Sequence, residues 1–352
     1  MDKLSIGIVG LGTIAKKMHV PTLSSFKDVA VKSAAEANVK RGERFAKKWN
    51  IPEVHGDYTK MYDNADLDAV FICLPNFLHY NAVKNALEHD LHVFCEKPMG
   101  LNADEAYELV KIAKKRNLVL AVGYNRMLEK NYEKAAEIVK SLRLGTILQA
   151  HGILVNPGPY AGWIPSSDWF FNDKYGVLYD SAPHLISIMM HILSDQITDV
   201  SAKGISTMHG FGLFDNIACI FMTKTGIVGT LNVGWKTAAS YDSIQLHGTG
   251  SSVFANPSEV EVRHGSYGPL EKIAENIKLT KNIISAQVGR MNENNAPNDT
   301  YFKEDRAFID AVLKGDKPLV SGEDGLRVLE VLEAIKKSLD DETGIRVSLH
   351  ER

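Results

Sequence analysis

The residues Leu4-Ser-Ile-Gly-Ile-Val9 run directly into Gly10-Leu-Gly12-Thr-Ile-Ala15. This order predicts a strand, a tight glycine turn and the start of a helix, the arrangement that a dinucleotide-binding crossover requires. Gly10 permits the sharp turn, Gly12 lets the backbone approach a pyrophosphate, and Ala15 lets the helix lie close to the strand. The unpaired amides at the start of the helix would hold the phosphates. We therefore expect cofactor contacts from Gly10, Leu11, Gly12, Thr13, Ile14 and Ala15.

A second strand-like run, Val29–Ala35, ends at Glu36. An acidic residue at this point can accept hydrogen bonds from the adenosine ribose hydroxyls. Glu36 would repel a ribose phosphate, so NAD is favoured over NADP, although the nearby Lys40 and Arg41 soften that preference. The alternative is a plain glycine turn with an unrelated surface glutamate.

The chain has 352 residues, more than one domain usually contains, so two domains are expected. Hydrophobic residues make up 45% of it and charged residues 24%, which is ordinary for a globular protein with a large core. A net charge of −3 gives no electrostatic support for nucleic acid or an anionic membrane as a partner.

The three cysteines, Cys73, Cys95 and Cys219, are odd in number and lack the spacing of a metal site. Cys73 and Cys95 lie within apolar runs, which predicts buried free thiols in a reducing compartment. The first apolar stretch is too short to span a bilayer, and Asp2 argues against a signal peptide. We therefore expect a cytoplasmic protein.

Strands and helices alternate over the first third of the chain, a pattern typical of a doubly wound parallel sheet. We assign residues 1–123 to this nucleotide-binding domain. Its expected strands and helices, after the two strands above, are strand 69–74, strand 91–95 and strand 118–123, with helices over 40–49, 80–89 and 103–115.

The pattern changes at about Tyr124, and we assign residues 124–352 to a second α/β domain. Successive strand-like runs joined by short turns predict an antiparallel sheet. The expected strands are 147–155, 200–205, 217–223, 227–233 and 243–248, and the expected helices are 132–142, 304–313 and 322–341.

Glu96-Lys97-Pro98 stands at the carboxyl end of a predicted buried strand, where ligands bind in open α/β sheets. Pro98 restrains Lys97 to an extended backbone and so aims its side chain. The bond before a proline is also the one place where a cis peptide is affordable. The alternative is a solvated lysine ahead of the next helix.

A second candidate stretch, Gly176-Val-Leu-Tyr-Asp180-Ser-Ala-Pro183-His184, precedes an apolar run that predicts a buried helix. Asp180 is suited to cap the amino end of that helix, and Pro183 fits only its first turn. His184 lies in the same turn, where the helix dipole disfavours an imidazolium and leaves a neutral base. A satisfied core histidine is the alternative.

Other polar and aromatic residues are less specific. His79 follows Pro75-Asn76 at a strand exit, where it is a packing or capping residue beside the cofactor. His19 and Pro21 fall in the first helix and indicate packing or a kink. Aromatic residues in a proline-rich loop (Tyr160, Trp163 and Trp169) suit stacking on a sugar or nicotinamide, or burial under the loop. We find no convincing metal-ligand spacing and no nucleophile in a glycine elbow.

Taken together, these motifs resemble the glucose–fructose oxidoreductase, inositol dehydrogenase and rhizopine catabolism (Gfo/Idh/MocA) family along essentially the whole chain. The matching elements, in chain order, are Gly10–Ala15, Glu36, Pro75-Asn76 with His79, Glu96-Lys97-Pro98, Gly123-Tyr124-Asn125-Arg126, and Asp180 with His184. The chain departs from the family where glycines often precede the Asp segment (here Lys174-Tyr175-Gly176) and at Ala182 and Ser187.

The resemblance implies a Rossmann domain followed by a domain with a large, open, mainly antiparallel sheet, through which dimers or tetramers form. It implies NAD, with NADP possible, and a sugar or polyol as substrate. The catalytic residues would be Lys97, Asp180 and His184. Tyr124 and Arg126 would join them in binding substrate, and the remaining cofactor contacts would be Leu74, Pro75, Asn76, His79, Glu96, Lys97, Asn125 and Trp169, with no metal.

Our mechanistic hypothesis is that His184 takes the hydroxyl proton of a secondary alcohol, Lys97 hydrogen-bonds the same oxygen, and Asp180 orients the site. One alternative is a regulatory protein that binds dinucleotide and sugar without redox chemistry. Another is a reductase of a non-sugar carbonyl or imine.

Overall fold

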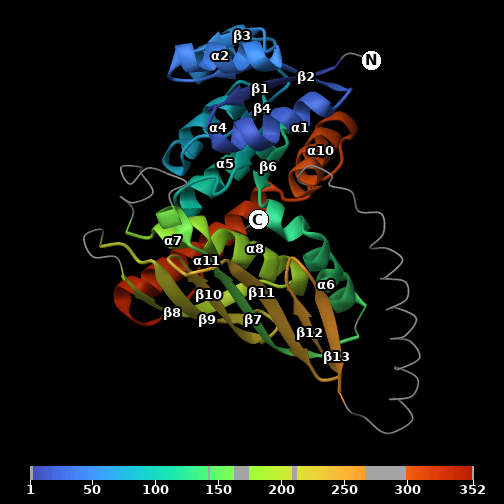
Figure 1. Cartoon of the computed structure of the whole chain (residues 1–352), viewed down its shortest axis with the longest axis vertical. Helices are drawn as coiled ribbons and strands as arrows, with labels where there is room; N and C mark the ends of the chain where they lie inside the picture. Colours follow the sequence, from blue (N-terminus) through green and yellow to red (C-terminus); the bar gives the residue numbers. More distant parts are fainter. Residues whose placement is uncertain (1–2, 142, 162–173, 208–211, 266–298, 351–352) are drawn as a thin grey trace.

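The first half of the molecule is built on a parallel six-stranded sheet. A computed structural model describes residues 3–141, 143–161, 174–207, 212–265 and 299–350 (Figure 1). The strand order is β3-β2-β1-β4-β5-β6 and every described pair is parallel. The strands are β1 (Leu4–Val9), β2 (Val29–Ala35), β3 (Glu53–His55), β4 (Ala69–Ile72), β5 (His92–Glu96) and β6 (Leu120–Gly123). This is the strand order of a doubly wound sheet, so the prediction of a doubly wound parallel sheet is confirmed.

Helices cover both faces of this sheet, which is why β1 and β4 are buried along their whole length. Asn102 caps the amino end of α5 by accepting a hydrogen bond from the Glu105 amide, at 2.8 Å. The helical segments are η1 (Ala15–His19), α1 (Val20–Ser25), α2 (Val39–Trp49), α3 (Tyr58–Asn64), η2 (Asn76–Leu78), α4 (His79–Glu88), α5 (Ala103–Arg116) and η3 (Asn125–Leu128).

The second half contains an eight-stranded sheet in the order β13-β12-β11-β7-β10-β9-β8-β14. Its neighbouring strands are antiparallel except β7 and β10, which are parallel, so the prediction of a mainly antiparallel sheet is confirmed. The strands are β7 (Ile147–Val155), β8 (Ile197–Ile205), β9 (Asn216–Thr223), β10 (Val228–Gly234), β11 (Tyr241–Gly248), β12 (Ser251–Ala255), β13 (Val260–His264) and β14 (Gly344–Arg346).

The two faces of this sheet differ in their surroundings. Along β9, Cys219 and Phe221 are buried while Ile220 and Met222 are exposed, the alternation expected of a sheet covered on one side. Among the residues that the structure describes, helices lie only on the face that points toward the first sheet (Figure 1). The helical segments of this half are α6 (Lys130–Lys140), η4 (Gly158–Ala161), α7 (Gly176–Asp180), α8 (Ala182–Leu193), α10 (Asp299–Lys314) and α11 (Gly322–Asp341).

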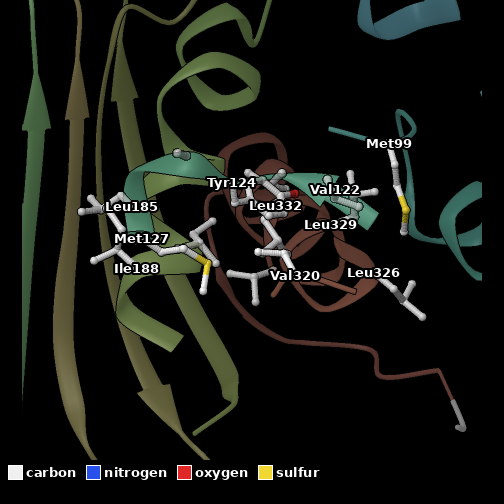
Figure 2. Packing of buried hydrophobic residues seen from close by; sticks show 14 of the residues in the cluster. Met99, Val122, Tyr124, Met127, Leu185, Ile188, Val320, Leu326, Leu329 and Leu332 are labelled. Atoms are coloured by element: carbon white, nitrogen blue, oxygen red, sulfur yellow. The ribbon is translucent and has the colours of Figure 1, made fainter. Parts of the chain in front are cut away.

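One continuous apolar core joins the two halves. Figure 2 shows Tyr124, which follows β6, beside Leu329 and Leu332 of α11, with Met127 and Leu185 farther along the same cluster. The chain also returns to the first half in α10, where Phe308 and Ile309 join the core beneath β1. Within the described residues, no helix is both long and apolar enough to cross a membrane.

Candidate active site

A cavity of about 300 Å³ lies between the two halves, at the carboxyl ends of β4 and β5. This is the edge at which ligands bind to doubly wound sheets. Its walls come from both halves and include most of the chemically reactive side chains singled out in the sequence. The lining residues are Ile14, Cys73, Leu74, Asn76, Glu96, Lys97, Pro98, Asn125, Gly176, Tyr179, Asp180, His184 and Tyr301.

Lys97 reaches from the first half of the molecule to the second. It directly follows β5, and its bond to Pro98 is cis. Its Nζ donates to the backbone oxygen of Asp180 at 2.7 Å and to Asp180 Oδ1 at 3.3 Å. The ammonium group is therefore held in place across the interface between the halves.

The Asp180 carboxylate is held by donors from three parts of the chain. Besides Lys97, Trp235 Nε1 donates to its Oδ2 at 3.2 Å and Ser181 Oγ donates to the same oxygen at 3.3 Å. The expectation that Asp180 caps the buried helix is wrong. Asp180 is the last residue of α7, Ser181 precedes α8, and neither side chain caps that helix. The carboxylate is engaged by Lys97 and Trp235 instead of by helix amides.

His184 is the third residue of α8 and lines the same cavity. Burial, reinforced by the positive charges of Lys97 and Arg126, lowers the pKa of His184 well below its usual value. Its Nδ1 is buried and has no hydrogen-bond partner among the described residues. The ring is thus neutral near pH 7 and is able to accept a proton.

The glycine turn has the shape that a dinucleotide needs. Gly10 has a φ of +86°, and a Cβ there would lie 2.7 Å from the carbonyl oxygen of Cys73, so only glycine fits. A Cβ on Gly12 would meet only that same oxygen, at 3.8 Å, which leaves the space beside the turn open. Residues 13–25 are helical, so the helix begins directly after the turn and its first amides are available to phosphate.

Glu36 is held beside this turn. Its Oε2 accepts from the Leu11 amide at 3.3 Å, and its Oε1 accepts from the Asn38 amide at 3.0 Å and from Arg41 Nη2 at 2.6 Å. Burial alone would raise the pKa of Glu36, but the hydrogen bonds and charge of Arg41 and the backbone amides lower it overall. Glu36 is therefore an ionised acceptor beside the glycine turn, and its contact with the ribose hydroxyls stays a prediction.

The other predicted cofactor residues fall into four groups. Ile14, Leu74, Asn76 and Asn125 line the cavity. His79 ties two loops together, with Nδ1 2.6 Å from the Pro98 oxygen and Nε2 2.7 Å from the Leu74 oxygen. Thr13 and Ala15 lie in the start of the first helix, and Pro75 precedes η2. Trp169, together with Trp163, lies outside the described residues.

Two predicted substrate contacts are not among the lining residues. Tyr124 is fully buried and faces a separate cavity between α8 and the start of α11. Arg126 forms ion pairs with Glu129 and Asp242. The positive charge of Arg126 helps to lower the pKa of His184.

Sequence reasoning missed several cavity residues. Tyr301 comes from α10, a helix far along the chain whose sequence gives no signal of a site. Cys73 and Tyr179 directly adjoin predicted residues and could have been found from that position alone. His19, which we expected to be a packing or kink residue, is bound by two carboxylates, Glu96 and Asp305.

Fold, glycine turn and cavity define a two-domain dinucleotide-binding oxidoreductase. Residues 4–124 match the model of the oxidoreductase family with an NAD-binding Rossmann fold, and residues 132–254 match the GFO/IDH/MocA C-terminal domain. The chain therefore belongs to the Gfo/Idh/MocA family of NAD-binding oxidoreductases.

Similar proteins cover nearly the whole chain. A myo-inositol 2-dehydrogenase from Thermotoga maritima is 24% identical, covering 98% of this chain and 98% of its own. A D-xylose 1-dehydrogenase (NADP(+)) from Haloferax volcanii is 29% identical, covering 98% and 100%. The structure of scyllo-inositol dehydrogenase from Lactobacillus casei with NAD(H) and scyllo-inositol superposes with a TM-score of 0.78 at 20% identity, covering 98% and 99%.

Proposed function

We propose that the protein oxidises a secondary alcohol of a sugar or polyol with NAD, or reduces the corresponding ketone. The observation that carries this proposal is the convergence of Lys97, Asp180 and His184 on one cavity from two halves of the molecule. The dehydrogenases named above act on inositols and on xylose, which supports the same substrate class.

Each of the three side chains has a separate task. His184 is neutral and buried, so it accepts the hydroxyl proton as the alcohol is oxidised. Lys97 gives two N–H groups to Asp180 and has a third for the substrate oxygen, whose growing negative charge it stabilises. Asp180 fixes the direction of that ammonium group. NAD, when bound, supplies the hydride acceptor, and the Gly10–Ala15 turn and Glu36 would hold it.

The test is a screen of cyclic polyols, aldoses and nucleotide sugars for NAD reduction, followed by His184→Ala and Lys97→Met variants. Each variant should lose about 10²–10⁴-fold in kcat. Each should keep its affinity for NAD, measured by fluorescence titration. Tight NAD binding with no turnover on the panel would favour a regulatory binder. Wild-type turnover by either variant would contradict the roles of His184 and Lys97.

Two further expectations remain part of this proposal. We infer that the chain forms dimers or tetramers through the uncovered face of its second sheet, where Ile220, Met222 and Val228 are exposed. We also infer that it works in the cytoplasm, which is supported by three free cysteine thiols, at Cys73, Cys95 and Cys219.

A further inference from the structure

A buried histidine links three distant parts of the chain. His19, in η1, is completely buried, and both of its ring nitrogens lie beside carboxylates. Nδ1 is 2.8 Å from Asp305 Oδ1 on α10, and Nε2 is 3.1 Å from Glu96 Oε1 at the end of β5. These two contacts span 286 and 77 residues of sequence.

The surroundings of His19 favour its charged form. Burial alone would lower the pKa of His19, but the charges and hydrogen bonds of Asp305 and Glu96 raise it well above its usual value. Glu96 is an acid, so burial alone would raise its pKa. The hydrogen bond and charge of His19, together with the charge of Lys97, lower the pKa of Glu96 overall. The rings around His19 are Phe71, Phe94 and Tyr301, with centroids 5.4, 5.2 and 5.5 Å away.

The neighbouring acid, Glu304, behaves differently. Both of its carboxyl oxygens are buried without a hydrogen-bond partner among the described residues. Burial, together with the charges of Glu96 and Asp305, raises the pKa of Glu304 well above its usual value. Burial also raises the pKa of Asp305, against the opposing effect of His19. The cluster therefore favours an imidazolium beside an ionised Glu96 and a neutral Glu304.

A metal ion is a second chemistry to weigh, because ligand atoms of His19, Glu304 and Asp305 all lie within 4.8 Å of one another. An imidazole binds a metal through a ring nitrogen that carries no proton. Both nitrogens of His19 are within hydrogen-bond distance of carboxylates. The contacts observed are those of an imidazolium that donates a hydrogen bond from each ring nitrogen to a carboxylate.

The cluster reaches the cavity through Glu96. This residue lines the cavity, and its Oε2 accepts from the backbone amide of Lys97 at 3.2 Å. Tyr301, which packs edge-on against His19, lines the same cavity. The reacting end of NAD has to lie near Lys97 and His184, and hence near the Glu96 carboxylate.

We propose that His19 and Asp305 are positioning residues that hold an ionised Glu96 against the reacting end of NAD, so that the pocket binds the oxidised cofactor in preference to the reduced one. The nicotinamide ring carries a positive charge in NAD⁺ and none in NADH, so a fixed carboxylate attracts only the oxidised form. This inference rests on the proposed function for the position of the reacting ring.

The test compares the dissociation constants of NAD⁺ and NADH by titration calorimetry in the wild type and in Glu96→Gln, His19→Gln and Asp305→Asn variants. Glu96→Gln should weaken NAD⁺ binding about tenfold and change NADH binding less than about twofold. His19→Gln and Asp305→Asn should shift the ratio of the two constants in the same direction by a few fold. Phe308→Leu, which loosens α10 against Phe71 and Phe94 without touching a charge, is the control.

The pH dependence separates positioning from simple structural support. In the wild type, the preference for NAD⁺ should persist on acidification, because the pKa of Glu96 is lowered. His19→Gln removes the charge and hydrogen bond that lower the pKa of Glu96. On acidification, Glu96 should therefore become protonated, and the preference for NAD⁺ should disappear, at a higher pH than in the wild type.

Three results would overturn the proposal. The first is a ratio of NAD⁺ to NADH dissociation constants in Glu96→Gln that equals the wild-type ratio. The second is an equal loss of affinity for NAD⁺ and NADH in His19→Gln and Asp305→Asn. The third is a stoichiometric metal ion in the purified wild type that His19→Gln lacks. These are binding measurements, so a failure to find a sugar or polyol substrate would count against the proposed function alone.

Discussion

At the scale of single residues, the site depends on side chains that hold one another. Lys97 and Trp235 both donate to the Asp180 carboxylate, although the three residues lie in three separate segments. Trp235 is itself fully buried. The direction of the Lys97 ammonium group is therefore set partly by an indole that does not line the cavity.

We expect Trp235→Phe to lower kcat by roughly tenfold, because a hydrogen bond to a charged group is worth about 1.5–3 kcal/mol. Binding of NAD should not change. Gly158→Ala should give a similar defect, since its Cβ would lie 2.6 Å from Trp235 Cγ. Gly226→Ala is the matched control, because Gly226 also has a positive φ but a Cβ there meets nothing within 4 Å. Full activity in Trp235→Phe would contradict this role of the indole.

The charge around His184 predicts a pH profile. Because its pKa is lowered well below 6.5, the acid limb of kcat/KM should lie below pH 6.5. Arg126→Met removes one of the positive charges responsible, so the limb should move to higher pH. Arg116→Met, at a surface pair with Asp90, should leave it unchanged. The lowered pKa also means that His184 contributes stability above pH 6.5, which is lost as the pH falls through its folded-state pKa.

The residues proposed as catalytic could be singled out in the sequence because each has a local signal. Lys97 stands between a buried strand and a proline, and His184 stands in the first turn of an apolar helix. His19 and Asp305 carry no such signal, since their contact forms only when α10 packs beside η1. Asp180 was also singled out, but its local sequence suggested a helix cap, whereas its partners Lys97 and Trp235 are distant in sequence.

At the scale of elements, long periodic segments were predicted more accurately than short ones. The predicted bounds of β7 and α11 agree with the structure. β3 and β14 have three residues each, too few for a periodic pattern, and β13 is mostly exposed, with an apolar alternation of only Val260 and Val262. The start of α11 is also marked in the sequence, by a serine followed three residues later by an acid.

Ser321 and Asp324 form a capping box at that start, with each side chain bonded to the backbone amide of the other. Ser321→Ala should lower the free energy of unfolding by about 1 kcal/mol. The expected observation is a lower urea midpoint with an unchanged slope. Ser258→Ala, at an exposed loop position, is the control, and an equal effect of both substitutions would rule out the cap as the cause.

At the scale of the whole molecule, one face of the second sheet carries no helix from the described part of the chain (Figure 1). Met222 and Val228 are directly opposite each other on neighbouring strands of this face, and both are exposed. Exposed apolar residues gathered on one surface are typical of an interface.

Ile220→Asp should therefore shift the protein toward smaller species in light scattering coupled to size exclusion, because the new carboxylate would be buried in the contact. Leu313→Asp, an exposed leucine on α10, should leave the mass unchanged. A wild-type protein that is monomeric at micromolar concentration, or an Ile220→Asp variant of unaltered mass, would count against an interface at this face.

The division of the chain at residue 123 stays a prediction, and α10 bears on how such a division can be used. This helix follows the second sheet in sequence yet packs beside α1 and supplies Asp305 to His19 and Tyr301 to the cavity. A recombinant fragment that stops after β6 would leave His19 without its counter-ion Asp305 and the core beneath β1 without Phe308. A chimaera that joins this nucleotide-binding half to a different substrate-binding half should therefore replace only the segment between β6 and α10. It should keep α10 from this chain.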